Sequence, residues 1–387
     1  MIKENPLISF LKKFDTYPFL VKLEGKEHKI GDGEPKFVID VHRMIPIKDL
    51  LKSTSLALGE AYMDKDLEVE GDLYQALDCL LEQFNKFSTN NSLLRDIVFT
   101  SSSKKNQLEE VQSHYDIGND FYALWLDKTL SYSCGYFKHE DDSLYQAQVN
   151  KVDYILEKLY LKEGMSLLDI GCGWGYLLIE AAKKYKVKGT GITLSKEQYH
   201  IFQKRILEEG LEDSLHVELM DYRDLPKMGE KFDRVVSIGM VEHVGRDNYK
   251  LFMDSVYRVL EKSGLFLLHF ISGRKEHHGD PWIKKYIFPG GTIPSLREIL
   301  YHAGALNFNT LDVENLRLHY NKTLLCWREN YYKHLDIINR QFDERFVRMW
   351  DLYLSSCAAS FHNGINDLHQ ILMTKGINNH LPLVRWY

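Results

Sequence analysis

The sequence predicts an α/β protein with two domains, a larger one built on a mostly parallel sheet and a smaller α/β module before it. The chain has 387 residues, more than a single domain usually contains. From residue 165 onward, short apolar runs alternate with segments of helical spacing, which is typical of such a sheet. Gly171, Gly173 and Gly175 lie in the turn between the first apolar run and the first helical segment, as glycines do in Rossmann-like folds.

Residues 1–87 have the pattern of the smaller module. They carry their own apolar positions and are followed by a polar segment, so we expect them to fold independently of the rest. We expect this module to serve in lipid contact or in dimer formation. The predicted strands are 19–23 and 36–41, with the turn signal Gly31-Asp32-Gly33 between them, and the predicted helices are 49–62 and 72–84.

Residues 88–106 are predicted to be a linker, because serine, threonine and asparagine gather at both of its ends. Residues 93–99 are predicted to form one short helical turn inside it. The remainder, 107–387, is predicted to be the second domain. Its expected strands are 165–170, 187–192, 215–219, 232–238 and 265–271, its expected helices are 176–185, 196–209 and 247–261, a Gly/Pro-rich excursion covers 272–295, and 342–373 is expected to be largely helical.

The composition excludes several classes of protein. A formal net charge of −6 argues against a nucleic-acid binder, and any contact with an anionic bilayer must use a local patch. The five cysteines are scattered and lack CxxC spacing, which indicates a reducing cytoplasm and no structural zinc. No apolar stretch approaches the ~20 residues that span a bilayer, so we expect a chain that does not cross membranes.

Asp169, directly before the glycine turn, favours one kind of ligand. A GxGxG turn alone also fits a nicotinamide or flavin dinucleotide site, or a turn with no ligand. A carboxylate at this place would oppose a pyrophosphate but suits the ammonium and sulfonium of S-adenosylmethionine. The sequence therefore predicts the class I S-adenosylmethionine-dependent methyltransferase fold.

Further candidate ligand residues follow the second and third strands. Thr193-Leu194-Ser195 stands where such folds usually carry an acid for the ribose hydroxyls, so Gln198, hydroxyls and backbone would have to replace it. Asp221 is placed to accept from the adenine amino group, and Tyr222 is placed to stack on the base. The alternative is a solvated loop acid beside a half-buried tyrosine.

Three other side chains are candidates for chemistry. Glu242 follows the fourth strand, where side chains face the ligand crevice of open α/β sheets, whereas His243 is as well interpreted as a supporting hydrogen-bond group. Upstream, 114–122 and 132–135 are too aromatic and polar for an ordinary loop. Cys134 precedes a glycine, as expected if its N–H points at a ligand, although a buried structural thiol fits the composition as well.

Together these segments resemble the cyclopropane-fatty-acyl-phospholipid synthases, a family that includes mycolic acid methyltransferases and some plant N-methyltransferases. The resemblance runs from His114 to about Leu381 and continues into the N-terminal module. The matching segments are Gly59 to Met63, Gly71 to Leu73, Tyr132 to Tyr136, Asp169 to Gly175, Gly191 to Ser195, Asp221 to Leu225, Glu242 to Gly245 and Lys285 to Gly291, together with the final helices.

The resemblance implies methyl transfer from S-adenosylmethionine to a cis double bond of a phospholipid acyl chain, with bicarbonate removing a proton as a cyclopropane ring closes. The implied bicarbonate and catalytic residues are Cys134, Glu242, His269, Ile271 and Tyr320. The implied cofactor residues are Tyr132, Ser133, Asp169, Gly171, Gly173, Trp174, Gly175, Thr193, Leu194, Ser195, Gln198, Asp221 and Tyr222.

The resemblance also implies unsaturated membrane phospholipids as partners, a homodimer, and peripheral contact with the inner face of the membrane from the cytoplasm. Phe137, Tyr286, Phe288 and the region 301–308 are expected either to line an acyl slot or to be plain core. Residues 282–286 have the composition of a segment that dips into a bilayer surface or of a lid. Two alternatives are a relative that methylates an amine or branches a lipid, and a lipid carrier that keeps a relic nucleotide fold.

Overall fold

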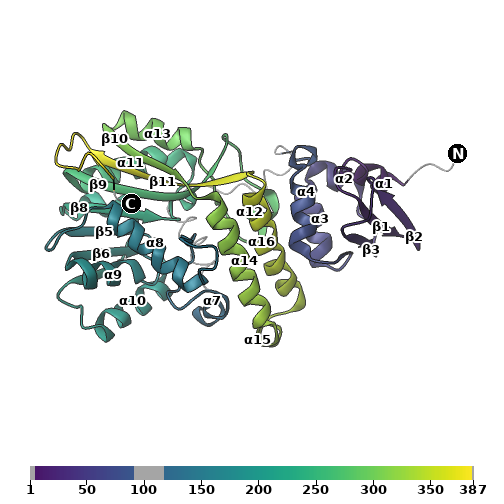
Figure 1. Ribbon diagram of the computed structural model, residues 1–387, viewed down its shortest axis with the longest axis horizontal. Coiled ribbons are helices and arrows are strands. Elements are labelled where there is room, and N and C mark those ends of the chain that lie inside the picture. The colour runs from purple at the N-terminus through teal and green to yellow at the C-terminus, as the bar shows by residue number, and fades with distance from the viewer. Residues whose placement is uncertain (1–4, 91–116, 386–387) are drawn as a thin grey trace. The chain divides into compact units, whose positions relative to one another are not determined.

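The computed structural model describes residues 5–90 and 117–385, which form two compact units that do not follow the order of the chain (Figure 1). The first unit holds 5–90 together with His278–Pro289 and Leu324–Ile365. The second holds 117–277, Gly290–Thr323 and 366–385. The expected helical turn at 93–99 and the residues 107–116 lie outside the described ranges.

The second unit is built on a seven-stranded sheet in the order β10-β11-β9-β8-β5-β6-β7, as predicted for an α/β protein. Five neighbouring strands are parallel, and the last two strands of the chain join them antiparallel. The parallel strands are β5 Ser166–Ile170, β6 Lys188–Thr193, β7 Leu215–Leu219, β8 Phe232–Ile238 and β9 Leu260–Gly273, and the antiparallel strands are β10 Phe308–Asn315 and β11 Asn366–Lys375.

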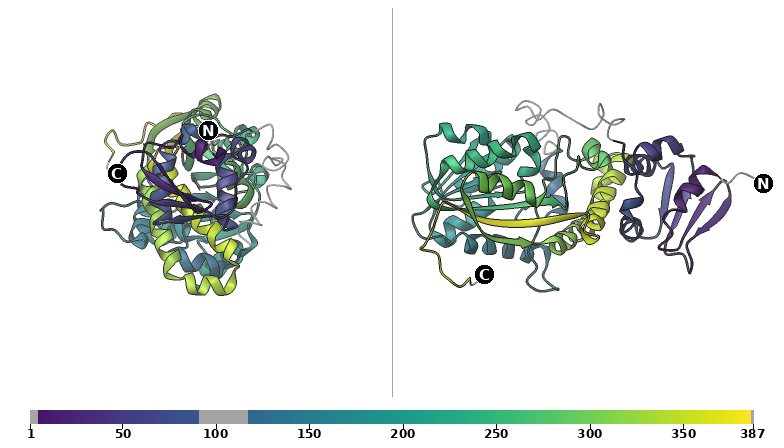
Figure 2. Two further views of the ribbon diagram at one scale, coloured as in Figure 1. Left: turned by 90° about the vertical axis from the view of Figure 1, so that its right-hand side faces the viewer. Right: turned by 90° about the horizontal axis from the view of Figure 1, so that it is seen from above.

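Helices cover both faces of this sheet (Figure 2). On one face, Ile155, Leu178 and Phe202 belong to the core contributed by three helices, and on the other face Phe252 and Ile299 belong to the core contributed by two. Burial of these apolar faces fixes the helices on the sheet. The helices of the first face are α8 Leu144–Lys158, α9 Tyr176–Tyr185 and α10 Lys196–Glu208, and those of the second are α11 Tyr249–Val259 and α13 Leu296–Ala305.

The first unit contains a separate four-stranded sheet in the order β2-β1-β3-β4. Its N-terminal core buries Phe10, Phe19 and Ile39 among the residues of that sheet and the helices on it. The elements are α1 Pro6–Leu11, β1 Phe19–Leu23, β2 Lys26–Ile30, β3 Val38–Val41, α2 Ile47–Lys52, α3 Thr54–Met63, β4 Leu67–Glu70 and α4 Leu73–Leu81.

Later parts of the chain complete the first unit. α12 (Pro281–Tyr286) packs on α3, and α16 (Glu344–His362) packs on α3 and α4. Arg348 Nε donates to the Tyr62 carbonyl at 2.6 Å, and Arg348 Nη2 donates to both the Leu67 carbonyl and the Glu68 carboxylate. The physical unit is thus larger than residues 1–87. The division into 1–87, 88–106 and 107–387 stays a prediction about which segments fold alone.

Two more helices connect these parts. α14 (Arg317–Lys333) begins in the second unit and ends in the first, and α15 (Leu335–Gln341) follows it.

The side chain of Trp282 in α12 is only 3% exposed and donates to Met63 Sδ at 3.2 Å. Trp282 therefore fills the interior of the first unit rather than presenting an indole to a bilayer. No helix in 5–90 or 117–385 is both long and apolar enough to cross a membrane.

The predicted elements were wrong where burial or helix capping overrides the local sequence pattern. The single helix expected over 49–62 is two helices, because Ser53 is extended and its side chain caps α3 through the Leu56 N–H. The strand β2 was missed because its polar sequence lies at an edge. The segment expected to be helical over 342–373 turns into β11 at Asn366. This strand was missed because residues 368–374 are all buried, so it lacks the alternation of apolar and polar residues that marks a half-exposed strand.

Other outcomes follow the same lines. The helix expected over 247–261 ends at Val259, and β9 begins at the next residue, five residues ahead of the strand start expected at 265. The turn at residues 31–33 follows β2 and does not join β1 directly to β3. The predicted bounds of β1, β7, β8 and α9 are confirmed.

Gly59→Ala is expected to lower the thermal unfolding midpoint, although alanine normally stabilises a helix by about 1 kcal/mol over glycine. A Cβ at Gly59 would stand 2.4 Å from Trp282 Cδ1, and overpacking of this kind costs roughly 1–3 kcal/mol. Gly304→Ala in α13 is the matched control, because a Cβ there meets nothing within 4 Å and should stabilise. A raised midpoint for Gly59→Ala would contradict the packing of α12 on α3.

Candidate active site

A cavity of about 150 Å³ opens at the carboxyl ends of β5, β6, β7 and β8 in the second unit. Ligands bind at this edge in open α/β sheets because the loops that follow parallel strands converge there. Every predicted cofactor residue except Gly175 and Ser195 lines it. Those lining residues are Tyr132, Ser133, Asp169, Gly171, Gly173, Trp174, Thr193, Leu194, Gln198, Asp221 and Tyr222.

The two exceptions shape the turns behind the cavity. Gly175 has φ 85°, and a Cβ there would lie 2.0 Å from Phe202 Cδ2, so this glycine lets α9 pack against α10. The Ser195 side chain caps α10 by accepting from the Gln198 N–H. Gly173 differs, because its φ is 55° while nothing lies within 4 Å of an added Cβ. The free side of Gly173 faces the cavity.

Asp169 ends β5 and places a buried carboxyl group on the cavity wall. Its side chain is 3% exposed, and its Oδ1 has no hydrogen-bond partner among the described residues. Burial raises the pKa of Asp169 to about 7, and the ammonium of Lys151 counteracts part of that rise. The cavity therefore contains an acid whose ionised form lacks a full partner, which fits a cationic ligand group.

Lys151 is a cavity residue that the sequence analysis missed. It projects from α8, is 3% exposed, and donates from Nζ to Ser133 Oγ at 2.9 Å. Burial lowers the pKa of Lys151 to about 8, against the opposing charges of Asp127 and Asp169. Lys151 lies on the buried face of α8, one turn after the buried Gln148, and only this packing distinguishes it from an exposed helical lysine.

The cavity residues that follow β6 and β7 are held in place by hydrogen bonds within the protein. Thr193 Oγ1 donates to Gln198 Oε1 at 2.8 Å, which ties the turn after β6 to α10. Asp221 is 4% exposed and accepts from Arg223 Nε at 2.7 Å and a terminal guanidinium nitrogen at 2.6 Å. Tyr222 is also buried. Asp221 is thus an oriented, buried carboxylate, and the alternative of a solvated loop acid beside a half-buried tyrosine is wrong.

Aromatic side chains, among them Tyr132 and Trp174, form another part of the cavity lining. Trp174 Nε1 donates to Asn119 Oδ1 at 2.8 Å, and its ring lies 5.7 Å from that of Tyr122. Tyr132 packs edge-on to Trp125 at 5.2 Å. The described part of the aromatic segment that begins at residue 114 therefore supports the cavity from α7 (Asn119–Trp125). His114, Tyr115 and Asp116 lie outside the described residues.

A second group of buried polar side chains forms around Glu242, in the short 3-10 turn after β8. Glu242 Oε1 accepts from the Ile271 N–H at 2.7 Å, and Oε2 has no partner in the part of the chain that the structure describes. Burial raises the pKa of Glu242 to about 7, against the effect of the Ile271 N–H. Ile271 thus supports Glu242 through its backbone, and that N–H is already engaged.

His269 lies on the same strand as Ile271 and on the same side of it. The amide of Gln370 donates to His269 Nδ1 at 3.1 Å, and Gln370 Oε1 accepts from Lys158 at 3.0 Å, which fixes the orientation of that amide. Burial lowers the pKa of His269 to about 3, so the ring is neutral and carries its proton on Nε2. Within the described residues, Nε2 has no partner.

Cys134 and Tyr320 converge through Leu316. Cys134 Sγ donates to the Leu316 carbonyl at 3.9 Å, and the Tyr320 N–H donates to the same oxygen at 3.2 Å. The Leu316 N–H in turn donates to the carbonyl of Leu368, which pairs with Ile271 across β11 and β9. The five predicted catalytic residues therefore occupy one region of the second unit.

The thiol of Cys134 has the properties of a structural group. It is fully buried, and burial raises its pKa well above the ordinary value, so it stays protonated. The next N–H, that of Gly135, donates to Thr323 Oγ1 at 3.0 Å. The side chain of Cys134 thus fits a buried structural thiol, and a ligand contact of this residue would have to use its main chain.

His243, next to Glu242, lines the cavity with Asp169, although none of the five predicted catalytic residues is among the described lining residues. Burial lowers the pKa of His243 to about 4, so it is a neutral group at physiological pH. A neutral imidazole at the cavity, next to Glu242 in the sequence, fits a supporting hydrogen-bond group rather than a group that transfers protons.

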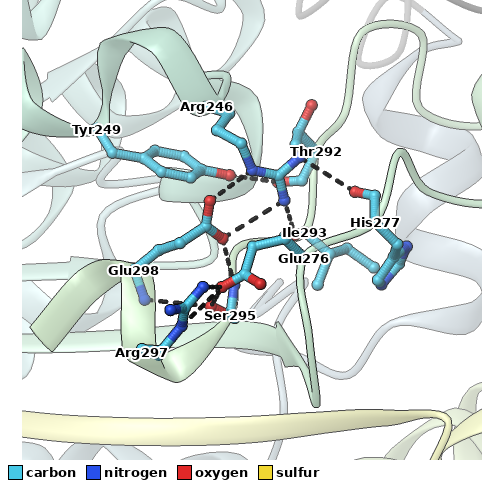
Figure 3. Close-up of polar contacts among 9 residues, drawn as sticks. All are labelled: Arg246, Tyr249, Glu276, His277, Thr292, Ile293, Ser295, Arg297 and Glu298. Carbon is cyan, nitrogen blue, oxygen red and sulfur yellow. Dashed lines mark hydrogen bonds and ion pairs between the residues drawn. The ribbon is translucent and has the colours of Figure 1, made fainter. Parts of the chain in front are cut away.

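Arg246 holds three loop segments together through its guanidinium group (Figure 3). It pairs with Glu298 at 2.5 Å and donates to the carbonyls of His277 and Ile293, which lie inside the excursion expected at 272–295. Thr292 N–H donates to the Glu242 carbonyl at 2.8 Å. These contacts therefore hold the chain that fixes the backbone of Glu242, a role that the sequence analysis did not assign to Arg246.

The aromatic side chains of the region 301–308 lie partly at the surface and partly in the core. Tyr301 is 72% exposed, whereas Phe308 is buried in the core beneath α11 and α13. Phe288 contacts Tyr353 inside the first unit, with ring centroids 5.9 Å apart. Of the aromatic residues suggested for a slot, Tyr301 is therefore a surface residue and Phe308 is plain core.

Comparison with known proteins identifies the family. A family model described as mycolic acid cyclopropane synthetase matches residues 102–371. The chain belongs to this family. A second model, described as a domain of unknown function, matches residues 7–92. The family assignment confirms the resemblance drawn from the motifs.

Individual relatives agree with it. The chain is 39% identical over 366 residues to a probable fatty acid methyltransferase of Pseudomonas putida, with 92% of each chain covered. It is 39% identical over 349 residues to the cyclopropane-fatty-acyl-phospholipid synthase of Escherichia coli K12, covering 87% of this chain and 88% of the relative. The crystal structure of mycolic acid cyclopropane synthase CmaA1 complexed with SAH and CTAB matches with a TM-score of 0.65 and 36% identity, over 69% of this chain and 98% of that one.

These findings confirm the predicted fold class, the class I S-adenosylmethionine-dependent methyltransferase fold with an additional N-terminal domain. They say nothing about individual residues of this chain, so the roles of the predicted catalytic and cofactor residues stay predictions.

Glu242→Gln is expected to raise stability at alkaline pH. Folded Glu242 keeps its proton up to about pH 7, whereas the unfolded chain releases it near 4.5. The unfolded state thus binds fewer protons between these values, so this group lowers the free energy of unfolding as pH rises through that window. Glutamine removes the effect, which amounts to about 3 kcal/mol above pH 7 and vanishes below 4.5.

Thermal unfolding midpoints at pH 4 and pH 8 measure this difference, with the exposed Glu163→Gln as the control for loss of a carboxylate. An equal effect of Glu242→Gln at both pH values would show that Glu242 titrates normally and is not held in a dry environment.

Proposed function

We propose that this protein transfers the methyl group of S-adenosylmethionine to a cis double bond in an unsaturated phospholipid acyl chain and closes a cyclopropane ring with the help of bicarbonate. The observation that carries the proposal is the pairing of two features in one family member. A cavity with a buried acid, Asp169, lies at the sheet edge, and the partnerless Glu242 and His269 atoms lie beside it.

The cavity residues fit the donor. Asp169 Oδ1 lacks a partner and suits the donor's ammonium, and the open side of Gly173 leaves room for close approach to the backbone. Asp221 and Tyr222 remain the proposed contacts of the adenine. Asp221 Oδ1 already accepts from the N–H and the Nε of Arg223, whereas Oδ2 accepts one hydrogen bond from this arginine and retains a second lone pair for the adenine. When bound, the donor supplies an electrophilic methyl group on a sulfonium.

Burial around Glu242 suits a reaction that forms a carbocation on the acyl chain. Cys134, His269 and Glu242 are all at most 8% exposed, which keeps away the water that would capture such a cation. In a dry pocket, fixed negative charge stabilises a developing positive charge strongly. The Ile271 N–H holds the Glu242 carboxylate, and the Thr292 N–H holds its carbonyl while Arg246 fixes the neighbouring Ile293 carbonyl.

The same group fits bicarbonate. Glu242 Oε2 can accept from the hydroxyl of the anion, while the His269 Nε2–H and the Tyr320 hydroxyl can donate to its other oxygens. Bound bicarbonate would supply the base that takes a proton from the added methyl as the ring closes. Ile271 acts on Glu242 in this proposal, because its N–H is already engaged there.

We also propose that the protein works as a peripheral enzyme at the inner face of the membrane, on unsaturated phospholipids, and as a homodimer. This part of the proposal rests on family membership and on the names of the relatives.

The decisive experiment incubates the purified protein with S-adenosylmethionine and vesicles of dioleoyl phosphatidylethanolamine and phosphatidylglycerol. Ring formation predicts acyl chains that gain CH₂ and lose their alkene proton signals. Gain of CH₂ with retention of an alkene would indicate a branching methyltransferase, and methylation of the ethanolamine head group would indicate an amine methyltransferase. Absence of both donor binding and turnover would favour a lipid carrier.

Glu242→Gln and Tyr320→Phe are expected to lower turnover in this assay by ~10²-fold or more while S-adenosylhomocysteine still binds, because both groups act on the anion and the cation. Rates in degassed buffer, with and without added bicarbonate, provide the second measurement. Bicarbonate should restore the wild-type rate and should help the two variants far less. A wild-type rate that never responds to bicarbonate would contradict the proposal that bicarbonate is the base that removes the proton.

Gly173→Val is expected to abolish binding of S-adenosylhomocysteine in calorimetric titration, because a branched side chain would fill the open side of the turn and resist φ 55°. Gly175→Ala provides the contrast. It should mainly lower stability by roughly 1–3 kcal/mol through the clash with Phe202. Unchanged affinity in folded Gly173→Val would show that the glycine turn does not contact the donor.

A further inference from the structure

Lys151 has hydrogen-bonding capacity that the protein itself does not use. A lysine ammonium has three donors, and the one hydrogen bond of Lys151 among the described residues goes to Ser133 Oγ. The group is 3% exposed and lines the cavity, so bulk water does not replace the missing acceptors. A buried ammonium in this condition is costly unless an acceptor or anion enters the cavity.

The position of Lys151 relative to Asp169 gives the kind of acceptor. Both side chains line the same cavity and interact electrostatically, yet Asp169 Oδ1 has no hydrogen-bond partner in the described ranges. The two groups therefore do not satisfy each other. A buried ammonium and a buried carboxylate that line one cavity and interact electrostatically are complementary to a ligand group that carries both charges, namely the zwitterionic head of an α-amino acid.

We propose that Lys151 binds the carboxylate of the donor's methionine moiety, while Asp169 takes its ammonium group. Ser133 is then a positioning residue, since its hydroxyl holds the Lys151 side chain in the cavity. The proposal rests on the proposed donor site and adds to it the group that recognises the amino-acid end. The same ammonium offsets part of the charge of Asp169 when the donor is absent.

Bicarbonate is the other anion in the proposed reaction, and the placement of Lys151 argues against it. Lys151 lines the cavity and interacts electrostatically with Asp169, the proposed partner of the donor's ammonium. None of the five residues proposed for bicarbonate is among the described residues that line this cavity. Lys151 is thus placed at the amino-acid end of the donor site.

The test compares two ligands by calorimetric titration, S-adenosylhomocysteine and its decarboxylated analogue, which keeps the amine and the adenosine. Wild-type protein should bind the first roughly 10- to 100-fold more tightly, the worth of a charge-assisted hydrogen bond. In Lys151→Met this ratio should fall to within about threefold, and in Lys151→Arg it should be largely restored. The readout is affinity, so catalysis does not enter.

Lys158→Met is the matched control. Lys158 lies two turns further along α8 and is also buried, but it pairs with Glu314 and Gln370 and is absent from the described lining of the cavity. Its variant should keep the wild-type ratio. Lys151→Gln replaces the methionine variant if the latter does not fold.

The outcomes separate this proposal from the donor site itself. Equal affinity of wild-type protein for the two ligands overturns the role of Lys151 while leaving the donor site intact, and so does a wild-type ratio in Lys151→Met. Failure of wild-type protein to bind S-adenosylhomocysteine overturns the donor site and Lys151 together.

Discussion

Burial of two carboxyl groups at one edge of the sheet is the constraint on which the rest of the site depends. Asp169 ends β5, and Glu242 follows β8, the neighbouring parallel strand. Each has a pKa raised to about 7 by burial, so each ionises in the folded protein only at a cost. Buried ionisable groups of this kind are typical of functional sites, because apolar residues at the same positions would make the folded protein more stable.

The surroundings of these two acids differ, and the difference matches two tasks. Asp169 has a cation near it, Lys151, and an open cavity in front of it. Glu242 has no charged group among the causes of its shifted pKa, and it is held by N–H groups of the backbone at Ile271 and Thr292. The first arrangement suits recognition of a charged ligand head, and the second suits orientation of a single charge in a dry pocket.

The sequence allowed prediction of the parts of the site that depend on local pattern. The GxGxG turn with Asp169 before it lies on a strand–turn–helix unit whose bounds follow from apolar periodicity, and the cavity is where that unit implies. Lys151 was beyond such reasoning, because a lysine on a helix is nearly always exposed and only the packing of α8 buries it. The role of Arg246 was equally hidden, since its partners lie on loops whose approach depends on tertiary contacts.

The convergence of the predicted catalytic residues shows why spacing along the chain could not reveal the site geometry. Cys134, Glu242, His269 and Tyr320 come from a loop, a turn, a strand and a helix, and no periodicity relates them. The antiparallel strand β11 connects them: it pairs with β9 beside Ile271, and its Leu368 carbonyl binds the Leu316 N–H at the start of α14. The same strand contributes Gln370, which orients His269. β11 was expected to be helical, so the element that assembles the region was the one that local pattern described least well. A strand buried on both faces shows no alternation, and its role becomes visible only once the sheet is assembled.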